Sequence, residues 1–399
     1  MSDLAVAAVK SAVLIVLLLT AFAYMTWLER KLLGKFQVRY GPNRVGPLGL
    51  LQPLADGVKL LFKENFRPAN VDVIVYVVAP TISMIAALFV YAVIPFGPEV
   101  SLFGRRFTLY LADVNVGILL ILATSSVGVY GIILGGWSSN SKYSLLGSLR
   151  SSAQLISYEL ALSLAVIAVV LTAGSLSLVE IVQAQSRIWF VALQPLGFLI
   201  FLIAAIAETN RAPFDLPEAE QELVAGFHTE YGGFKFAMFY AGEYIGIVTM
   251  SALTTTLFLG GWQGPLLPPL VWFALKTFAF IFFFIWLRAT MPRVRHDQLM
   301  AFGWKVLVPL GLLNIVVTSI IVILGGSRAP QSAWSGATRG RRRRCCGDSA
   351  SRFATSSSRR SPSSIRRRSA TPCSPASRVG TGSPSTRMGW SAVSAASCA

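Results

Sequence analysis

The chain has 399 residues, of which 54% are hydrophobic and only 13% are charged. Soluble globular proteins carry about 25% charged residues, so this composition excludes a soluble globular fold for most of the chain. The formal net charge of +17 comes mainly from residues 327–399, which hold 14 arginines and a single acid, Asp348.

The body of the chain, residues 1–326, has no cysteine and only two histidines, His228 and His296. Haem, iron–sulfur and zinc sites need more of these residues, so we predict no metal site and no cofactor bound by this chain alone. A redox centre would have to lie on another chain. The first apolar run is too long for a cleavable signal peptide, and Glu29 and Arg30 follow it where a cleavage site would need small residues.

Eight apolar runs in the body are long enough to cross a bilayer, which takes about 20 mostly apolar residues. The predicted spans are about 8–28, 73–95, 115–136, 153–174, 189–207, 236–258, 268–290 and 305–325. A soluble all-α core cannot supply so many uncharged runs. We therefore predict an all-α polytopic membrane protein with about eight transmembrane helices.

The connections between these spans differ strongly in charge. Most lysines and arginines of the body lie in or beside one alternate set: 29–72, 137–152, 208–235 and 291–304. Cytoplasmic loops of membrane proteins carry such an excess. This set is therefore predicted to be cytoplasmic, which puts the N-terminus outside.

The longest connection, 29–68, contains a turn followed by a helical pattern. Its "GPNRVGP" predicts the turn. Apolar residues then recur at helical spacing, and charged residues occupy the other faces. The apolar set is Leu50, Leu51, Leu54, Val58, Leu61 and Phe62, and the charged set is Asp56, Lys59, Lys63 and Glu64. We predict an amphipathic helix over 48–64, lying at the cytoplasmic membrane surface, packed on a soluble partner, or both.

The connection 96–114, on the opposite side, alternates weakly between apolar and polar residues and has glycine at its turn. This pattern predicts a short β-hairpin.

Carboxylates gather at the cytoplasmic side of the predicted bundle. Glu159 and Glu243 lie about two turns inside the fourth and sixth spans, which puts them about 9–12 Å below the surface at 1.5 Å per residue. Glu208 closes the fifth span. The connection that follows, "RAPFDLPEAEQELVAGFHTEY", adds Asp215, Glu218, Glu220, Glu222 and Glu230.

These acids have few cations beside them in the sequence, because Arg211 is the only one between Glu208 and Glu230. A charge inside a bilayer costs about 2.5–3.5 kcal/mol on insertion scales, and it persists where it faces a wet cavity or a partner. Clustered carboxylates in a low dielectric can hold and pass protons near neutral pH. We interpret the set as the mouth of a proton or charge path. The alternative is a group of ordinary loop acids paired with arginine and lysine.

Residues 327–399 are rich in arginine and serine and have almost no apolar face to bury, so they are predicted to be a disordered, low-complexity tail. After eight spans this basic tail would emerge outside, against the positive-inside pattern. Three explanations of residues 327–399 remain open. They form a real tail that touches lipid headgroups or nucleic acid, they follow a missing ninth span, or they are the product of a shifted reading frame. We favour the shifted frame.

Four stretches of the body resemble one known family. They are "QVRYGPNRVGPLGLLQPLADGVKLLFKE", "SKYSLLGSLRSSAQLISYE", "RAPFDLPEAEQELVAGFHTEY" and "FIWLRATMPRVRHDQL". They are similar to the H subunit of bacterial respiratory complex I, the NADH-quinone oxidoreductase; in mitochondria the same protein is called subunit 1. The resemblance covers about 1–325 and does not extend over 326–399.

The resemblance implies a multi-pass subunit of the bacterial inner membrane that forms the membrane side of the quinone chamber. Its substrate is quinone, and the flavin and iron–sulfur clusters lie on partner subunits of the peripheral arm. The other partners are small and antiporter-like membrane subunits and lipid, with no nucleic acid. The implied quinone-binding residues are Glu29, Arg30, Phe62, Lys63 and Phe227. The implied proton path comprises Glu159, Glu208, Glu218, Glu220, Glu222, Glu230 and Glu243, with counter-charges at Arg211 and Arg288. Asp215 caps or braces the acid-rich connection 208–235, or belongs to the proton path.

Two other functions remain open from the sequence. A membrane subunit of a ferredoxin- or hydrogenase-linked energy-converting complex shares the pattern "PFD.PE.E.ELV.G", although the long stretch Arg30–Phe66 favours the quinone enzyme. A secondary transporter would also carry membrane carboxylates. It would show paired halves with broken helices, which are not evident in this sequence.

Overall fold

The structure is a computed structural model and describes residues 3–98, 100–102, 105–215 and 224–324. The predicted tail, 327–399, lies outside the described residues, as do Glu218, Glu220 and Glu222. The longer helices are α1 (Asp3–Phe36), α3 (Val73–Phe89), α4 (Gly117–Ser138), α5 (Lys142–Ala173), α8 (Pro195–Glu208), α10 (Gly233–Phe258), α11 (Pro269–Thr290) and α13 (Val308–Leu324). The shorter elements are η1 (Pro47–Gly49), α2 (Gln52–Phe62), η2 (Val90–Ala92), β1 (Val100–Leu102), β2 (Arg105–Phe107), α6 (Leu178–Ala184), α7 (Phe190–Leu193), η3 (Gly226–His228), α12 (His296–Phe302) and the π-helical turn η4 (Gly303–Leu307).

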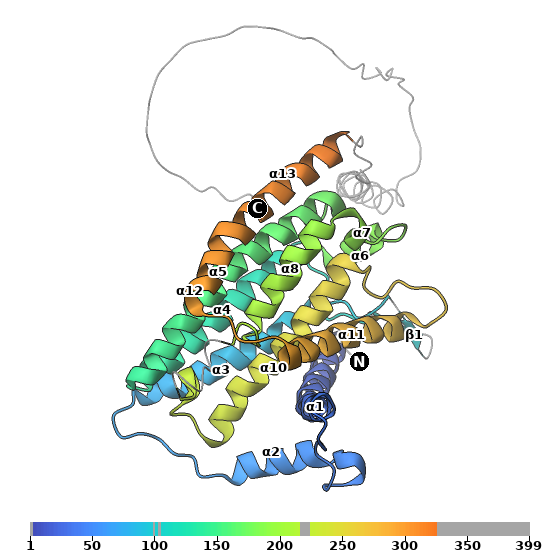
Figure 1. Cartoon of the computed structure of the whole chain (residues 1–399). Coiled ribbons are helices and arrows are strands. Elements are labelled where there is room, and N and C mark those ends of the chain that lie inside the picture. Colours follow the sequence, from blue (N-terminus) through green and yellow to red (C-terminus); the bar gives the residue numbers. More distant parts are fainter. Residues whose placement is uncertain (1–2, 99, 103–104, 216–223, 325–399) are drawn as a thin grey trace, which may run out of the picture. The chain divides into compact units, whose positions relative to one another are not determined.

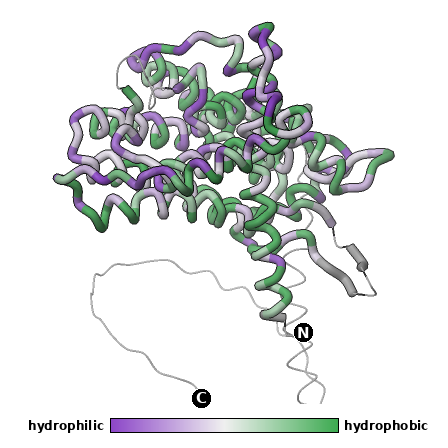
Figure 2. Tube along the Cα trace, turned by 90° about the horizontal axis from the view of Figure 1, so that it is seen from below, coloured by the Kyte–Doolittle hydropathy of each residue, from purple (hydrophilic) through white to green (hydrophobic). Residues whose placement is uncertain are grey.

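Within the described ranges, seven helical segments are long and apolar enough to cross a membrane. They contain α1, α3, α4, α5, α10, α11 and the continuous run from α12 to α13. The prediction of a polytopic helical membrane protein is confirmed. Figure 2 shows that α1, beside the N-terminus, is largely hydrophobic.

The predicted fifth span is broken in two before Pro195, a break that the apolar character of residues 189–207 did not indicate. Helices α7 and α8 meet at Gln194, whose φ of −134° and ψ of 63° are not helical. Pro195 begins α8, where its missing N–H and fixed φ are tolerated. With 14 residues, α8 is about 21 Å long, less than the hydrocarbon core of about 30 Å.

Two connections are shorter than predicted because the helices beside them are longer. Helix α1 continues to Phe36, so Glu29 and Arg30 belong to the helix and not to the connection after it. Helix α5 begins at Lys142, so most of the predicted connection 137–152 is helical. Lysine, arginine, leucine and glutamate favour helix, and polar residues extend a helix past the apolar run that hydropathy detects.

The predicted amphipathic helix is present as α2, which lies beneath α1 and α10 in the view of Figure 1 and contacts both. None of its residues is buried. Leu54, Leu61 and Phe62 are 67%, 65% and 86% exposed. An apolar face left uncovered by the chain itself fits a helix at a membrane surface.

The predicted hairpin is confirmed, since β1 and β2 pair antiparallel with Val100 opposite Phe107.

Helix α5 lies at the centre of the bundle, in contact with α4, α8 and α13 (Figure 1). Small residues allow the close approach. Ala161, Ala165 and Ala168 of α5 and Ala204 and Ala205 of α8 are fully buried. In a membrane, where helix association depends on packing, such residues let the backbones come near one another.

Gly147 of α5 faces the backbone of η3, so that a Cβ atom would lie 2.8 Å from the Cα of Gly226. We expect Gly147→Ala to lower the free energy of unfolding by about 1–3 kcal/mol, because backbone atoms would have to move. The matched control is Gly57→Ala on α2, where nothing lies within 4 Å. Thermal unfolding of the detergent-solubilised protein measures both. Equal unfolding temperatures for the two variants would contradict this packing.

Candidate functional site

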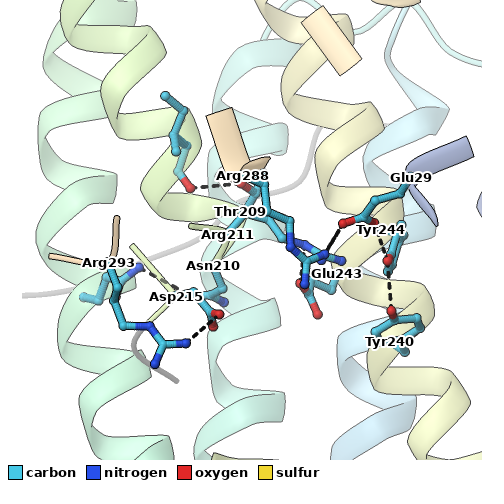
Figure 3. Close-up of polar contacts among 12 residues, drawn as sticks. Glu29, Thr209, Asn210, Arg211, Asp215, Tyr240, Glu243, Tyr244, Arg288 and Arg293 are labelled. Atoms are coloured by element: carbon cyan, nitrogen blue, oxygen red, sulfur yellow. Dashed lines mark hydrogen bonds and ion pairs between the residues drawn. The ribbon is translucent and has the colours of Figure 1, made fainter. Parts of the chain in front are cut away.

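Four charged side chains from separate parts of the chain meet in the interior and form what we call the arginine cluster. It consists of Glu29 of α1, Arg211 from the connection after α8, Glu243 of α10 and Arg288 of α11 (Figure 3). Arg211 Nη1 lies 3.3 Å from Glu29 Oε1, and Arg211 Nε lies 2.6 Å from Glu243 Oε1. Arg288 pairs with the same oxygen of Glu29. Two positive and two negative groups make the cluster neutral.

Burial makes this neutrality necessary. Glu29 is 3% exposed and Arg211 is 5% exposed, so neither can rely on bulk water for solvation. Burial alone would favour the uncharged form of Arg211, but the charges of Glu243 and Glu29 outweigh it and raise the pKa of Arg211 above its usual value. Arg211 therefore stays charged at every physiological pH.

Two tyrosines of α10 complete the cluster. The hydroxyl of Tyr244 donates to Oε2 of Glu29, and its ring lies 4.3 Å from the guanidinium carbon of Arg211. The hydroxyl of Tyr240 lies 2.8 Å from that of Tyr244. Tyr240, Glu243 and Tyr244 are spaced i, i+3 and i+4, so one face of α10 presents all three. That spacing is a signal in the sequence, but it was not among the predicted site features.

The connection that carries Arg211 is braced from two sides. Gln154 of α5, fully buried, donates to the carbonyl oxygens of Ala207 and Phe214, both at 2.9 Å. Arg293, after α11, lies 3.0 Å from Asp215. Asp215 therefore has a bracing contact from outside its own connection, one of the two roles considered for it.

A cavity of about 140 Å³ lies beside the arginine cluster, among α3, α4, α5, α8 and α10. Glu208 and Glu243 line it together with Thr209 and Asn210. Two lining atoms, Glu208 Oε2 and Ser83 Oγ, are buried without a hydrogen-bond partner among the described residues. Buried polar atoms of this kind are normally satisfied by ordered water, and the volume admits several molecules.

Glu159 of α5 lies next to this cavity, although it is not among the residues that line it. Ser125 and Ser126 of α4 both donate to its Oε1, and Ser125 also lines the cavity. Glu208 is close enough to Glu159 for their charges to interact. The two serines stand in an apolar span, where hydroxyl pairs are conspicuous, but they too were not among the predicted site residues.

The residues expected to bind quinone fall into three places. Glu29 is in the arginine cluster. Arg30 points elsewhere and pairs with Asp56 of α2 at 2.7 Å, and Phe62 and Lys63 are exposed at the end of α2. Phe227 is buried and lines the cavity with Glu208.

The residues expected to form the proton path are only partly brought together. Glu208 and Glu243 share the cavity, and Glu159 adjoins it through Ser125. Glu230 does not line the cavity, and its backbone carbonyl accepts a hydrogen bond from Tyr76 at 2.7 Å. The expected counter-charges, Arg211 and Arg288, both pair with Glu29.

No group of three or more His, Cys, Asp or Glu residues within the described ranges is arranged to hold a metal ion.

A family model described as NADH dehydrogenase matches residues 9–319. The chain belongs to the NADH dehydrogenase family. One relative is an H subunit of the NADH-quinone oxidoreductase of Geobacter sulfurreducens, 58% identical over 321 residues, covering 80% of this chain and 98% of that protein. The corresponding H subunit of Protochlamydia amoebophila is 57% identical, covering 76% and 94%, and that of Thermomicrobium roseum is 55% identical, covering 78% and 95%. The family resemblance of the four sequence stretches is confirmed.

The NADH dehydrogenase match contains every described residue of the arginine cluster and the cavity. It ends before residue 327. The arginine-rich tail is thus not part of the matched region.

Arg211→Gln should lower the free energy of unfolding by about 3–5 kcal/mol, because Glu29 and Glu243 would be left buried with too little positive charge. The control is Arg293→Gln, which removes the partly exposed pair with Asp215 and should cost less than about 1 kcal/mol. Thermal unfolding of the purified protein in detergent compares them. A larger loss for Arg293→Gln would mean that the cluster is not the stabilising contact.

Because His228 is titratable and largely buried, we expect the free energy of unfolding of the protein to fall in acid. Burial lowers its pKa to about 4, and the charge of Asp215 opposes this only in part. Between pH 6.5 and about 4, the unfolded chain binds a proton that the folded chain does not, so stability falls as the pH decreases, by at most about 3 kcal/mol. Unfolding temperatures at pH 7 and pH 5 should differ less in His228→Asn than in the unchanged protein. Identical pH dependence in the two would contradict this.

Proposed function

We propose that this chain is the H-type membrane subunit of a proton-translocating NADH:quinone oxidoreductase. In this role it forms the membrane side of the quinone chamber and an acidic path that couples quinone reduction to proton pumping. Flavin and iron–sulfur clusters on partner subunits supply the electrons. The names of the relatives, all of them H subunits of NADH-quinone oxidoreductases, support the assignment.

One observation carries the coupling role. Buried charged groups follow one another without a gap from Glu29 through Arg211 to Glu243, and Glu243 shares a cavity with Glu208. Ser125 then links the cavity to Glu159. A line of ionisable groups through an apolar bundle is expensive to maintain and persists where it carries ions or charge.

Residues of α1 and α2 form the entrance for quinone in this proposal. The exposed apolar residues of α2, among them Leu54, Leu61 and Phe62, suit an isoprenoid tail that enters from lipid. Lys63 supplies positive charge toward the headgroup, and Arg30 ties α1 to α2 through its pair with Asp56. Glu29, next to Arg30 in α1 and buried, supports a connection between this proposed entrance and the arginine cluster.

The coupling follows from the neutrality of the arginine cluster. Reduction of a quinone to a quinol consumes two electrons and two protons. A change of charge beside Glu29 alters the field on Arg211 and Arg288, and Arg211 in turn holds Glu243. Because the interior screens charges weakly, the imbalance acts over the length of the cluster. Glu243, which is ionised in the neutral cluster, then takes up a proton from the cavity more readily.

The same proposal places the chain in the bacterial inner membrane with its N-terminus outside and its acidic connection in the cytoplasm. Its partners are the quinone-site and iron–sulfur subunits of the peripheral arm and the small and antiporter-like subunits of the membrane arm. Glu218, Glu220, Glu222 and Glu230 continue the path toward the cytoplasm.

A ferredoxin- or hydrogenase-linked complex is the second candidate, because the sequence pattern of the acidic connection is shared. The names of the relatives favour the quinone enzyme. Assays of native membranes with NADH and with reduced ferredoxin distinguish the two donors. Inhibitor-sensitive quinone reduction with NADH is the expected result.

Glu208→Gln in the assembled complex tests the path. It keeps the shape of the side chain but removes its ability to ionise. We expect quinone reduction to fall by about tenfold, or about 1.4 kcal/mol in barrier, while NADH oxidation by an artificial acceptor at the flavin stays normal.

The matched control is Glu180→Gln, which changes an exposed carboxylate on α6 that does not line the cavity. It should leave both activities unchanged. Normal quinone reduction and normal proton pumping in Glu208→Gln would defeat this placement of the path.

A further inference from the structure

Two neighbouring hydroxyl groups hold Glu159. Ser125 and Ser126 are consecutive on α4, yet both donate to Glu159 Oε1 on α5, Ser125 from 3.3 Å. Consecutive side chains of a helix point about 100° apart, so the carboxylate of Glu159 lies between the directions in which Ser125 and Ser126 point. It is therefore held from two sides by neutral donors.

Each hydroxyl also has a second acceptor. The backbone carbonyl oxygen of Leu122 lies 3.0 Å from Ser125 Oγ and 3.0 Å from Ser126 Oγ. A hydroxyl group has one proton, so it can donate either to Glu159 or to Leu122 at any moment.

Because each serine hydroxyl can donate to either acceptor, Glu159 can be hydrogen-bonded both when it is ionised and when it is protonated. When the carboxylate is ionised, both serine protons can turn toward it. When it is protonated, it donates to a serine oxygen, and the proton of that serine turns to Leu122. No buried donor is left without an acceptor in either state, and only hydroxyl rotation is needed.

Ser125 has one contact that Ser126 lacks, because it also lines the cavity that holds Glu208 and Glu243. Glu159 itself does not line that cavity. Ser125 is thus the side chain that faces both the cavity and Glu159. The buried atoms Ser83 Oγ and Glu208 Oε2, without partners among the described residues, indicate that water occupies the cavity.

We infer that Ser125 and Ser126 are positioning residues for Glu159, and that Ser125 passes protons between water in the cavity and Glu159. The oxygen of Ser125 accepts a proton from a hydronium ion in the cavity, which leaves a neutral water molecule, as its own proton moves to the carboxylate, so the serine ends as a neutral hydroxyl. Rotation of that hydroxyl resets it. The inference rests on the proposed function, since it adds a step to the same path.

The experiment uses the assembled complex in native membranes and compares Ser125→Ala, Ser126→Ala and Ser126→Thr. Proton pumping per NADH oxidised and inhibitor-sensitive quinone reduction are measured. Each alanine variant should lower quinone reduction by about tenfold, the factor expected for one hydrogen bond to a charged group. Ser126→Thr keeps the hydroxyl and should restore the rate. The matched control is Thr124→Ala, since among the residues that the structure describes Thr124 donates only to Leu120 of its own helix.

A spectroscopic measurement separates positioning from mere packing. The infrared difference spectrum of quinone reduction should contain a carboxyl C=O band that disappears in Glu159→Gln. In Ser126→Ala that band should move to higher wavenumber, because the carboxyl loses a hydrogen bond. If an alanine variant does not assemble, Ser126→Cys replaces it, since its thiol has similar size and donates only weakly.

The outcomes distinguish this inference from the proposed function. Normal rates and an unshifted band in the serine variants, with Glu159→Gln impaired, would overturn the serine relay alone. The absence of a Glu159 band in the unchanged complex would do the same. Normal quinone reduction and pumping in Glu159→Gln would overturn the proposed path at Glu159 itself.

Discussion

The neutralisation of buried charge is the constraint on which the rest of this structure depends. Glu29 and Arg211 lie in an interior that cannot solvate either of them alone, and they are compensated by Arg288 and Glu243. These four residues come from α1, α10, α11 and the connection after α8. Loss of one charge would leave another uncompensated, so the same interaction fixes where these elements meet and links them electrostatically.

The cavity extends this constraint into the bundle. Glycines of α4 and α10 line it and leave room beside the carboxylates, and Glu243 belongs both to the cavity and to the arginine cluster. A carboxylate that pairs with an arginine on one side and faces a wet space on the other can respond to charge and exchange a proton. Glu208 and Glu159, the latter through Ser125, then continue the line of ionisable groups.

The opposite end of the bundle is organised differently. Lys276 of α11 donates to the carbonyl oxygens of Leu259, Gly261 and Gln263, and lies 4.6 Å from the ring of Trp189. Gln185 donates to Thr256 and accepts from the backbone of Gly260. Here backbone dipoles satisfy one cation, so the local structure does not depend on a balance between opposite charges.

The sequence by itself determined the membrane class, seven of the eight spans, the hairpin, the amphipathic helix and the family, because hydropathy, periodicity and motifs are local properties of the chain. It also located Glu159, Glu208 and Glu243 near one end. Only the tertiary structure decided which charges meet. Glu29 contacts Arg211 and Arg288, far away in sequence, while its neighbour Arg30 pairs with α2. Such pairings depend on how each helix is rotated and how closely it packs, and local sequence patterns do not specify either. The serines around Glu159 emerged for the same reason, whereas the break at Gln194 precedes Pro195, a local signal that hydropathy alone does not register.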